Sequence, residues 1–293
     1  TTYDSGLRDL PNGILGATQG GRFLRICDPE LSPTCTSPID AAKLAVKFQD
    51  DYNVGDQDAD PDYQASWVMG DRLPAGDNEW GYYLAAEYES RTHDRGDAEL
   101  SDPLDISGGY QRTQEATALT TYASAGYEYG LADEVLSKTM FLRNSEDTVR
   151  QEFGINNRED SDEDSVILEW VEREFFSQAF TGHNEFEQGD LGHAIDWRAS
   201  YSRTERDEPD RRSYRYINNN LAFSAFERRW SDLEEDAIDL GVDYSLDWNW
   251  GDVSTTQFQL GALWSDKDRE VEQYRFGYIQ GDNFNNLDVS IDQ

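Results

Sequence analysis

The chain has 293 residues, and 60 Asp and Glu against 25 Lys and Arg give it a formal net charge of −35. A nucleic-acid binder needs a basic surface to displace the counterions of phosphate, so this charge excludes that class. The aromatic content of 13% argues against a disordered chain. No run approaches the roughly 18 consecutive apolar residues of a transmembrane helix, and Thr1–Leu10 lacks the pattern of a signal peptide. What remains is a β-rich protein with a very polar, acidic exterior.

The N-terminal region contains the chain's two cysteines, Cys27 and Cys35, in the segment ICDPELSPTC. They are either unrelated thiols or a disulfide that closes a small loop in an oxidising compartment. The turn-forming Pro, Ser and Thr between them favour the disulfide, and with it an extracytoplasmic location. No histidine lies near enough to complete a metal site. Further on, residues 40–48 (DAAKLAVKF) have apolar residues at helical spacing and predict a short helix.

From residue 64 onward the dominant signal is a two-residue period. In IDLGVDYSLDWNW, which starts at Ile238, apolar and aromatic residues alternate with Asp, Gly, Ser and Asn. A strand points successive side chains to opposite faces, so this segment predicts a strand with one apolar and one polar face. Four other segments alternate in the same way: 80–89, 119–129, 195–202 and 257–265. The phase is less clean in 135–143 and 166–181, which we also expect to be strands.

The connections between these segments alternate in length. Short turns are expected at 74–78, 131–134, 185–190 and 251–254, and long polar stretches lie at 91–111, 144–165, 204–235 and from 266 onward. In an antiparallel meander this places the short turns at one end and the long loops at the other. The sequence therefore predicts an all-β fold, an antiparallel transmembrane β-barrel segment of about eight to ten strands with long acidic extracellular loops. A soluble β-sandwich, whose apolar face would be its core, is the alternative.

The aromatic residues favour the barrel, because several strands carry Trp or Tyr on the apolar face near the short-turn end, as an interfacial girdle requires. The residues expected to face lipid or to form the girdle are Trp80, Tyr82, Leu84, Tyr127, Tyr129, Trp197, Tyr201, Val242, Tyr244, Trp248, Trp250, Phe258 and Trp264. The opposite, polar residues of these strands should face the lumen.

Clusters of acidic residues are the first candidates for a binding site. Asp56, Asp58, Asp60 and Asp62 occupy every second position, as in a calcium loop, but Pro61 and Trp67 stand where the turn glycine and the bidentate Glu belong. Solvated loop charge is the favoured interpretation, and no metal or other cofactor is expected. The sequence has no nucleophile elbow and no phosphate-cradling glycine loop, so we do not expect an enzyme.

Two stretches resemble the mid-barrel of TonB-dependent outer-membrane receptors. The first follows Phe180–Phe186 and carries the family's strand and loop pattern at Asp196, Trp197, Ser200, Tyr201, Ser202, Arg206, Asp207, Glu208, Pro209, Asp210 and Arg211. The second is Leu260–Tyr278. The specific motifs cover some 40 residues, whereas the strand rhythm extends from about Gln64 to Tyr278. Such receptors have about 22 strands around a plug domain, so the resemblance implies an internal fragment of a receptor, with residues 1–63 as an extracellular loop and 64–293 as barrel strands and loops.

The resemblance implies uptake of a scarce nutrient, such as a siderophore or glycan, across the outer membrane of a Gram-negative cell. The partners would be outer-membrane lipid, the TonB complex through the absent plug, and a small-molecule or oligosaccharide ligand. The expected ligand contacts are aromatic residues of the long loops: Tyr110, Phe153, Tyr214, Tyr216 and Trp230. Two alternatives stay open, a soluble secreted acidic β-protein that binds glycan or calcium, and a small complete barrel with an enzymatic or adhesive function.

Overall fold

The computed structural model describes residues 6, 8–18, 24, 26, 30, 35–48, 52, 54–55, 58–101, 106–130, 132–222, 226–250, 254–280 and 287–290. Cys35 is disulfide-bonded, whereas Cys27 and Asp56 lie outside the described residues. Among the residues that are described, no helix has the length and apolar character needed to cross a membrane.

Two short helices precede the strands: α1 (Ile14–Ala17) and α2 (Pro38–Ala45). The helix predicted over 40–48 is therefore confirmed, shifted by two to three residues at each end. Its start follows from local chemistry. Ser37 caps the helix, with its Oγ accepting a hydrogen bond of 3.1 Å from the backbone N–H of Asp40, and Pro38 occupies the first turn, where no N–H is needed.

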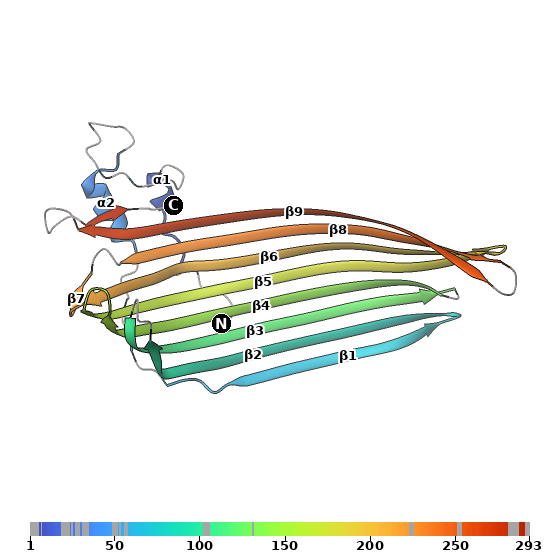
Figure 1. Ribbon diagram of the computed structural model, residues 1–293, viewed down its shortest axis with the longest axis horizontal. Helices are drawn as coiled ribbons and strands as arrows, with labels where there is room; N and C mark the ends of the chain where they lie inside the picture. The colour runs from blue at the N-terminus through green and yellow to red at the C-terminus, as the bar shows by residue number, and fades with distance from the viewer. Residues whose placement is uncertain are drawn as a thin grey trace.

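All the remaining elements belong to one antiparallel sheet of ten strands (Figure 1). The strands are β1 (Tyr63–Ala75), β2 (Asn78–Ser101), β3 (Ile106–Tyr129), β4 (Asp133–Asn156), β5 (Ser161–Gln188), β6 (Leu191–Ile217), β7 (Asn220–Leu221), β8 (Glu227–Asn249), β9 (Thr255–Gln280) and β10 (Leu287–Ser290). They follow one another across the sheet in chain order, with β7 pairing only with β6. The prediction of an all-β antiparallel meander is confirmed. The described sheet is not closed, since β1 and β10 lie at its two edges.

At each of the four predicted short turns, one strand ends and the next begins within a few residues, and these connections lie together at one end of the sheet (Figure 1). Residues 131 and 251–253 of the predicted turns lie outside the described residues. The predicted long loops at 91–111, 144–165 and 204–235 are wrong, because most of these residues belong to strands. The β4–β5 connection, for example, is only the turn between Asn156 and Ser161. Strands β2 to β6 have 24 to 28 residues each, so at about 3.3 Å per residue they extend some 80–90 Å.

The physical reason for this error is that a sequence alternates between apolar and polar residues only where one face of the strand meets an apolar environment and the other meets a polar one. In the half of the sheet away from the short turns, both faces carry charged side chains. Backbone pairing continues there, for instance from Glu115↔Asp147 to Ile106↔Asn156 between β3 and β4, but no two-residue period of polarity marks it. Pro209 also suggested a loop, yet it lies at a bulge in β6 between Glu208 and Arg211, where a strand tolerates proline.

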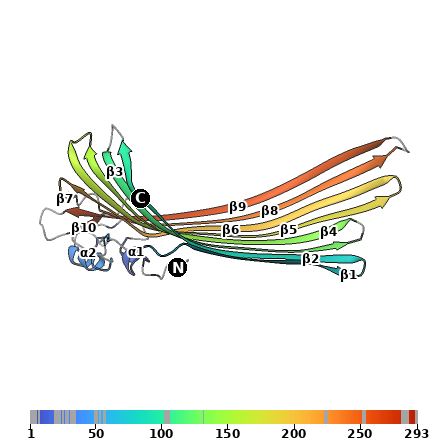
Figure 2. The same ribbon diagram turned by 90° about the horizontal axis from the view of Figure 1, so that it is seen from below.

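The sheet is a single curved layer with little core of its own. Helices α1 and α2 lie on its convex side (Figure 2), and the buried hydrophobic cluster consists of Ile14, Phe48, Trp230 and Phe276. Large apolar side chains elsewhere stay exposed, including Trp264 at 53% and Val242 at 44%. A sandwich would bury such residues beneath a second sheet, and all the named strands of the described chain belong to this one sheet.

A close approach of side chain to backbone occurs where β5 and β6 pair. Gly182 is the register partner of Trp197, and a Cβ at Gly182 would overlap the indole ring. We therefore expect Gly182→Ala to displace Trp197 and to lower the free energy of unfolding by about 1–2 kcal/mol, measured by urea titration. Gly192→Ala is the matched control in β6, because its Cβ would meet nothing closer than 3.6 Å. Equal stability of the two variants would contradict the packing described here.

Candidate functional site

The register of the sheet places the predicted lipid-facing residues on one face, which we call the apolar face, except Trp250, which follows the end of β8. In one row of paired residues Trp80, Tyr127, Val135, Gly182, Trp197, Val242 and Ala262 follow one another from β2 to β9. In two further rows, Tyr244 pairs with Ile195 and Leu260, and Leu246 pairs with His193 and Phe258. The sequence prediction of which side chains share a face is thus correct for β2, β3, β6, β8 and β9. It is weakest for β4, where Leu136, Met140 and Leu142 point to the opposite face.

The apolar face is apolar only in a band next to the short turns. On β2 the last apolar residue of the band is Tyr88, and the residue that stands in the same row on β9 is Glu270. On β9 itself the band already ends at Trp264, six residues earlier. The edge of the band therefore shifts by about one residue per strand over the six steps from β2 to β9. With about 3.3 Å per residue and 4.8 Å between strands, this corresponds to a band inclined by about 35° to the rows.

Aromatic rings gather on this face at the short-turn end. The ring centroids of Trp80 and Tyr127 lie 4.4 Å apart, and those of Tyr127 and Tyr129 lie 5.6 Å apart. Toward the other edge of the sheet, Trp248 of β8 stacks on Trp250, with ring centroids 4.0 Å apart. These rings form part of the predicted girdle, and they come from the ends of different strands.

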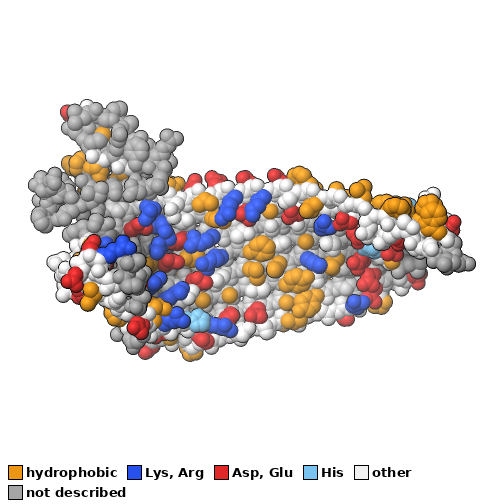
Figure 3. Space-filling view, viewed as in Figure 1, with side chains coloured by type: hydrophobic (Ala, Val, Ile, Leu, Met, Phe, Trp, Pro, Cys, Tyr) orange, Lys and Arg blue, Asp and Glu red, His pale blue; other side chains and the backbone are white. Residues whose placement is uncertain are grey.

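The opposite face, which we call the polar face, is concave (Figure 2). It carries ion pairs from Arg72–Glu79 near the short turns to Arg275–Glu227 in the other half of the sheet. At the level of the apolar band, Arg198 binds Asp243 at 2.7 Å and His183 Nδ1 lies 2.7 Å from Asp196. Lysines and arginines gather in the half away from the short turns (Figure 3). The polar residues predicted to face a lumen therefore share one face.

Glu208 is the most heavily paired carboxylate of the polar face. Its side chain is 2% exposed and binds Arg206 at 2.8 Å and Arg229 at 2.5 Å, with Arg211 at 3.8 Å. Burial alone would raise the pKa of Glu208, but the hydrogen bonds from Arg229 and Arg206 outweigh it and hold the pKa below its ordinary value of 4.5. The carboxylate therefore stays ionised among its arginines in mildly acidic solution.

The N-terminal segment docks on the apolar face beyond the band. Trp230 packs against Phe48 and Phe276, with ring centroids at 5.6 and 5.5 Å, and its Nε1 donates a hydrogen bond of 2.8 Å to the carbonyl oxygen of Arg8. The Arg8 guanidinium lies 4.5 Å from the ring centroid of Trp170 and binds Asp147 at 3.1 Å. Residues some 220 positions apart in the chain are thereby held together.

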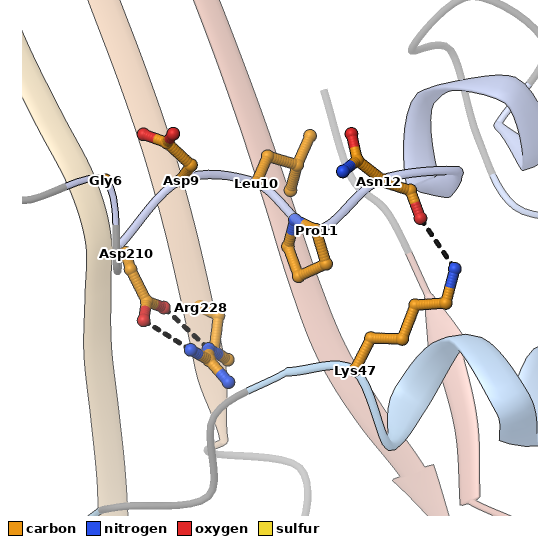
Figure 4. A pocket seen from close by; sticks show the side chains of 8 residues that line it. All are labelled: Gly6, Asp9, Leu10, Pro11, Asn12, Lys47, Asp210 and Arg228. Carbon is orange, nitrogen blue, oxygen red and sulfur yellow. Dashed lines mark hydrogen bonds and ion pairs between the residues drawn. The ribbon is translucent and has the colours of Figure 1, made fainter.

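A buried charge cluster underlies this docked segment (Figure 4). Asp210, 5% exposed, binds both Arg212 and Arg228, which are 8% and 2% exposed. The Arg228 guanidinium also lies 4.9 Å from the ring centroid of Phe48. A cavity of about 310 Å³ opens beside the cluster, and the residues lining it are Gly6, Asp9, Leu10, Pro11, Asn12, Lys47, Asp210 and Arg228. Asp9 and Asp210 balance Lys47 and Arg228, so the cavity has no excess charge.

The five predicted ligand-contact residues all lie on strands, not in loops, which corrects that expectation. Tyr214, Tyr216 and Trp230 share the apolar face beneath the N-terminal segment, where Tyr214 donates a hydrogen bond of 2.8 Å to the carbonyl oxygen of Tyr52. Phe153, 39% exposed, is on the same face of β4. Tyr110 alone is on the polar face, where its hydroxyl accepts a hydrogen bond of 2.9 Å from Arg95. The structure therefore does not bring the five together.

Carboxylates dominate the apolar face just beyond the band. Glu205, Glu234 and Glu270 stand in one row, and in the next row burial and the carboxylates of Glu205 and Glu272 raise the pKa of Asp232. Within the described part of the chain, no three His, Cys, Asp or Glu side chains are grouped so as to hold a metal ion. Asp58, Asp60 and Asp62 of the calcium-like segment are exposed. Asp62 accepts a hydrogen bond of 2.7 Å from the backbone N–H of Thr92.

Strand alternation does not predict that Asp210, Arg212 and Arg228 come together, because the bulge at Pro209 changes which side chains share a face. No protein-family model matches the chain, and a search of curated proteins finds no significant match.

Because the pKa of Glu208 is lowered in the folded state, its stabilising contribution is fully present above pH 4.5 and is lost as the pH falls through the shifted value. We expect Glu208→Gln to lower the free energy of unfolding near neutral pH by about 3 kcal/mol, since Arg206 and Arg229 lose their carboxylate and Arg211 keeps only Glu169. The variant should also show a shallower acid-side loss of stability than the wild type. Urea unfolding across the acidic range measures both effects, with the exposed Glu187→Gln as control. Parallel pH profiles for Glu208→Gln and wild type would contradict this assignment.

Removing the Trp230 side chain should release the N-terminal segment from the sheet, because both its ring contacts and its bond to Arg8 are lost. We expect Trp230→Ala to speed tryptic cleavage after Lys43 and Lys47 by about tenfold, as local opening becomes easier. Trp264→Ala is the control, since that side chain is on the same face and 53% exposed. Unchanged cleavage in Trp230→Ala would show that other contacts hold the segment.

Proposed function

We propose that this chain forms a sector of the wall of an outer-membrane β-barrel receptor of the TonB-dependent class, which takes up a scarce nutrient. The apolar face would contact lipid and the polar, concave face would line the lumen. The edge strands β1 and β10 would pair with further strands of the closed barrel, because lipid tolerates no open sheet edge. In this proposal the protein performs no chemistry on its ligand.

The observation that carries the proposal is the inclined apolar band. Strands of transmembrane barrels are tilted by about 35–45°, and a flat membrane layer would then cross the rows of paired residues at the same angle. The band edge of about 35°, derived from the register alone, agrees with that expectation. The band spans 9 residues on β2, from Trp80 to Tyr88, close to the roughly 9–11 residues that cross the hydrocarbon.

Two further features support an embedded wall. The exposed Trp and Tyr rings at the short-turn end would lie at the membrane interface, where amphipathic rings are favoured. The charged halves of the strands would extend beyond the membrane on the other side, with the N-terminal segment docked against their outer surface. The resemblance of residues 193–216, which follow 180–186, and of residues 260–278 to TonB-dependent receptors agrees with this arrangement.

A charge placed in the band tests the proposal. Leu240 is 47% exposed on the apolar face and stands beside Trp264, at the edge of the band. Leu240→Arg would therefore put a guanidinium into lipid at a cost of about 1–2 kcal/mol, less than at the bilayer midplane. We expect it to reduce the amount of chain recovered in the outer-membrane fraction of a Gram-negative host several-fold. Ser200→Arg is the matched control, because Ser200 is on the polar face beside its register partner Asp239.

The wild type should require detergent for extraction. A wild-type chain recovered in the aqueous fraction, with Leu240→Arg behaving like Ser200→Arg, would favour the alternative of a soluble acidic β-protein.

A further inference from the structure

The polar face carries two rows of three arginines in direct register. Arg95, Arg112 and Arg150 stand side by side on β2, β3 and β4, and Arg211, Arg229 and Arg275 on β6, β8 and β9. We call these six residues the arginine belt. It crosses the half of the sheet away from the short turns, where Figure 3 shows the blue side chains gathered.

Such rows are unfavourable for the sheet alone. Like charges directly opposite each other on neighbouring strands destabilise the pairing, and acidic residues outnumber basic ones by 60 to 25 in this chain. Rows of carboxylates follow from that composition, but rows of three arginines do not. In the second row Glu169, Glu208 and Glu227 already pair with the arginines. In the first row no ion pair to Arg95 or Arg112 is found among the described residues, so a bound anion would remove the repulsion there.

The ion pairs of the belt leave its guanidinium groups available. Arg150 is 43% exposed and its partner Glu152 only 21%, and Arg229 is 23% exposed above Glu208 at 2%. The carboxylates thus lie beneath the arginines, and each guanidinium keeps N–H donors that its carboxylate does not use. Arg112 is exposed, and no ion pair to it is found within the described residues.

An aromatic ring and a cavity lie within the first row. The Arg150 guanidinium is 5.5 Å from the ring centroid of Tyr110, whose hydroxyl accepts the bond from Arg95. A cavity of about 340 Å³ is lined by His93, Asp94, Arg95, Arg112 and Gln114. Arginines with forked donors beside a ring face are suited to rigid ligands that carry carboxylate, sulfate or phosphate groups.

We propose that the arginine belt binds a small ligand with several carboxylate, sulfate or phosphate groups, such as an acidic oligosaccharide. This inference rests on the proposed function, in which the polar face lines the lumen and the belt lies near its outer opening. Arg95 follows the band edge at Tyr88 by seven residues, or roughly 23 Å along the strand. On the apolar face, the carboxylate row of Glu205, Glu234 and Glu270 lies between the band and the level of the belt, and it would repel the anion from the outer surface.

Binding of defined anions to the full chain in detergent tests the proposal. The probes are a sulfated oligosaccharide, an oligogalacturonate and inorganic tripolyphosphate, with a neutral malto-oligosaccharide of similar length as reference, measured by isothermal titration calorimetry. We expect at least one anionic probe to bind, more weakly at high salt, and the neutral one not to bind. The triple variant Arg95→Gln/Arg112→Gln/Arg150→Gln should bind at least tenfold more weakly. The anion that binds identifies which charged group the belt recognises.

Two control variants make the result specific. Arg112→Gln removes an exposed side chain to which no ion pair is found among the described residues, so it should fold normally and still weaken binding about threefold. Arg72→Gln removes an exposed cation of the polar face near the short turns, outside the belt, and should bind like the wild type. Absence of anion binding by the wild type, or equal losses in Arg72→Gln and Arg112→Gln, would overturn the proposal. Membrane fractionation of the same samples is a separate readout, so a chain that enters the membrane but binds no anion overturns only the arginine belt.

Discussion

The backbone register of the sheet is the constraint on which every other feature depends. Because successive side chains of a strand point to opposite faces, a slip of one residue between β6 and β8 would exchange the apolar and polar faces of all later strands. The pairing is continuous from Leu191↔Trp248 to Glu208↔Ser231, with a bulge beyond it. Backbone hydrogen bonds do not depend on the type of side chain. Over this length they hold the strands in one register, and that register keeps the apolar and the polar side chains on separate faces.

Side-chain character changes along the strands while the backbone does not. Val242 and Trp264 stand in the apolar band, and further along the same face Glu234 and Glu270 stand opposite each other. A globular protein would gather its apolar residues in one core, but here the buried hydrophobic cluster is confined to the contact with the N-terminal segment. The arrangement is stable only if the apolar band meets an apolar environment and the charged half of the strands meets water, as the membrane proposal requires.

The strands and turns near the apolar band were predictable from the sequence, and the remainder of the strands were not. Alternation identified 238–250 because one face there is apolar. In residues 144–156 of β4, charged and polar side chains lie on both faces, so no clear alternation marks the strand and the segment was predicted to be a loop. The grouping of Tyr214 with Trp230 was also out of reach, because it depends on Phe48 and Tyr52 from a segment more than 150 residues away. Local alternation depends on the environment of the two faces of a strand. The docking of a distant segment on that strand produces no such alternation in the sequence.

The bulge in β6 links the two charged clusters of the structure. Between Glu208 and Arg211 the strand advances three residues against two on β8, and Pro209, which has no N–H to donate, fits such a break in the ladder. The extra residue places Arg211 on the polar face beside Arg229, and Arg212 on the apolar face beside Arg228. Without it these two arginines would exchange faces: the arginine belt would lose its member on β6, and Asp210 would lose a buried partner beneath the N-terminal segment. One inserted residue thus sets the charge of both faces at once, so its removal should disturb the docked segment and the anion site together.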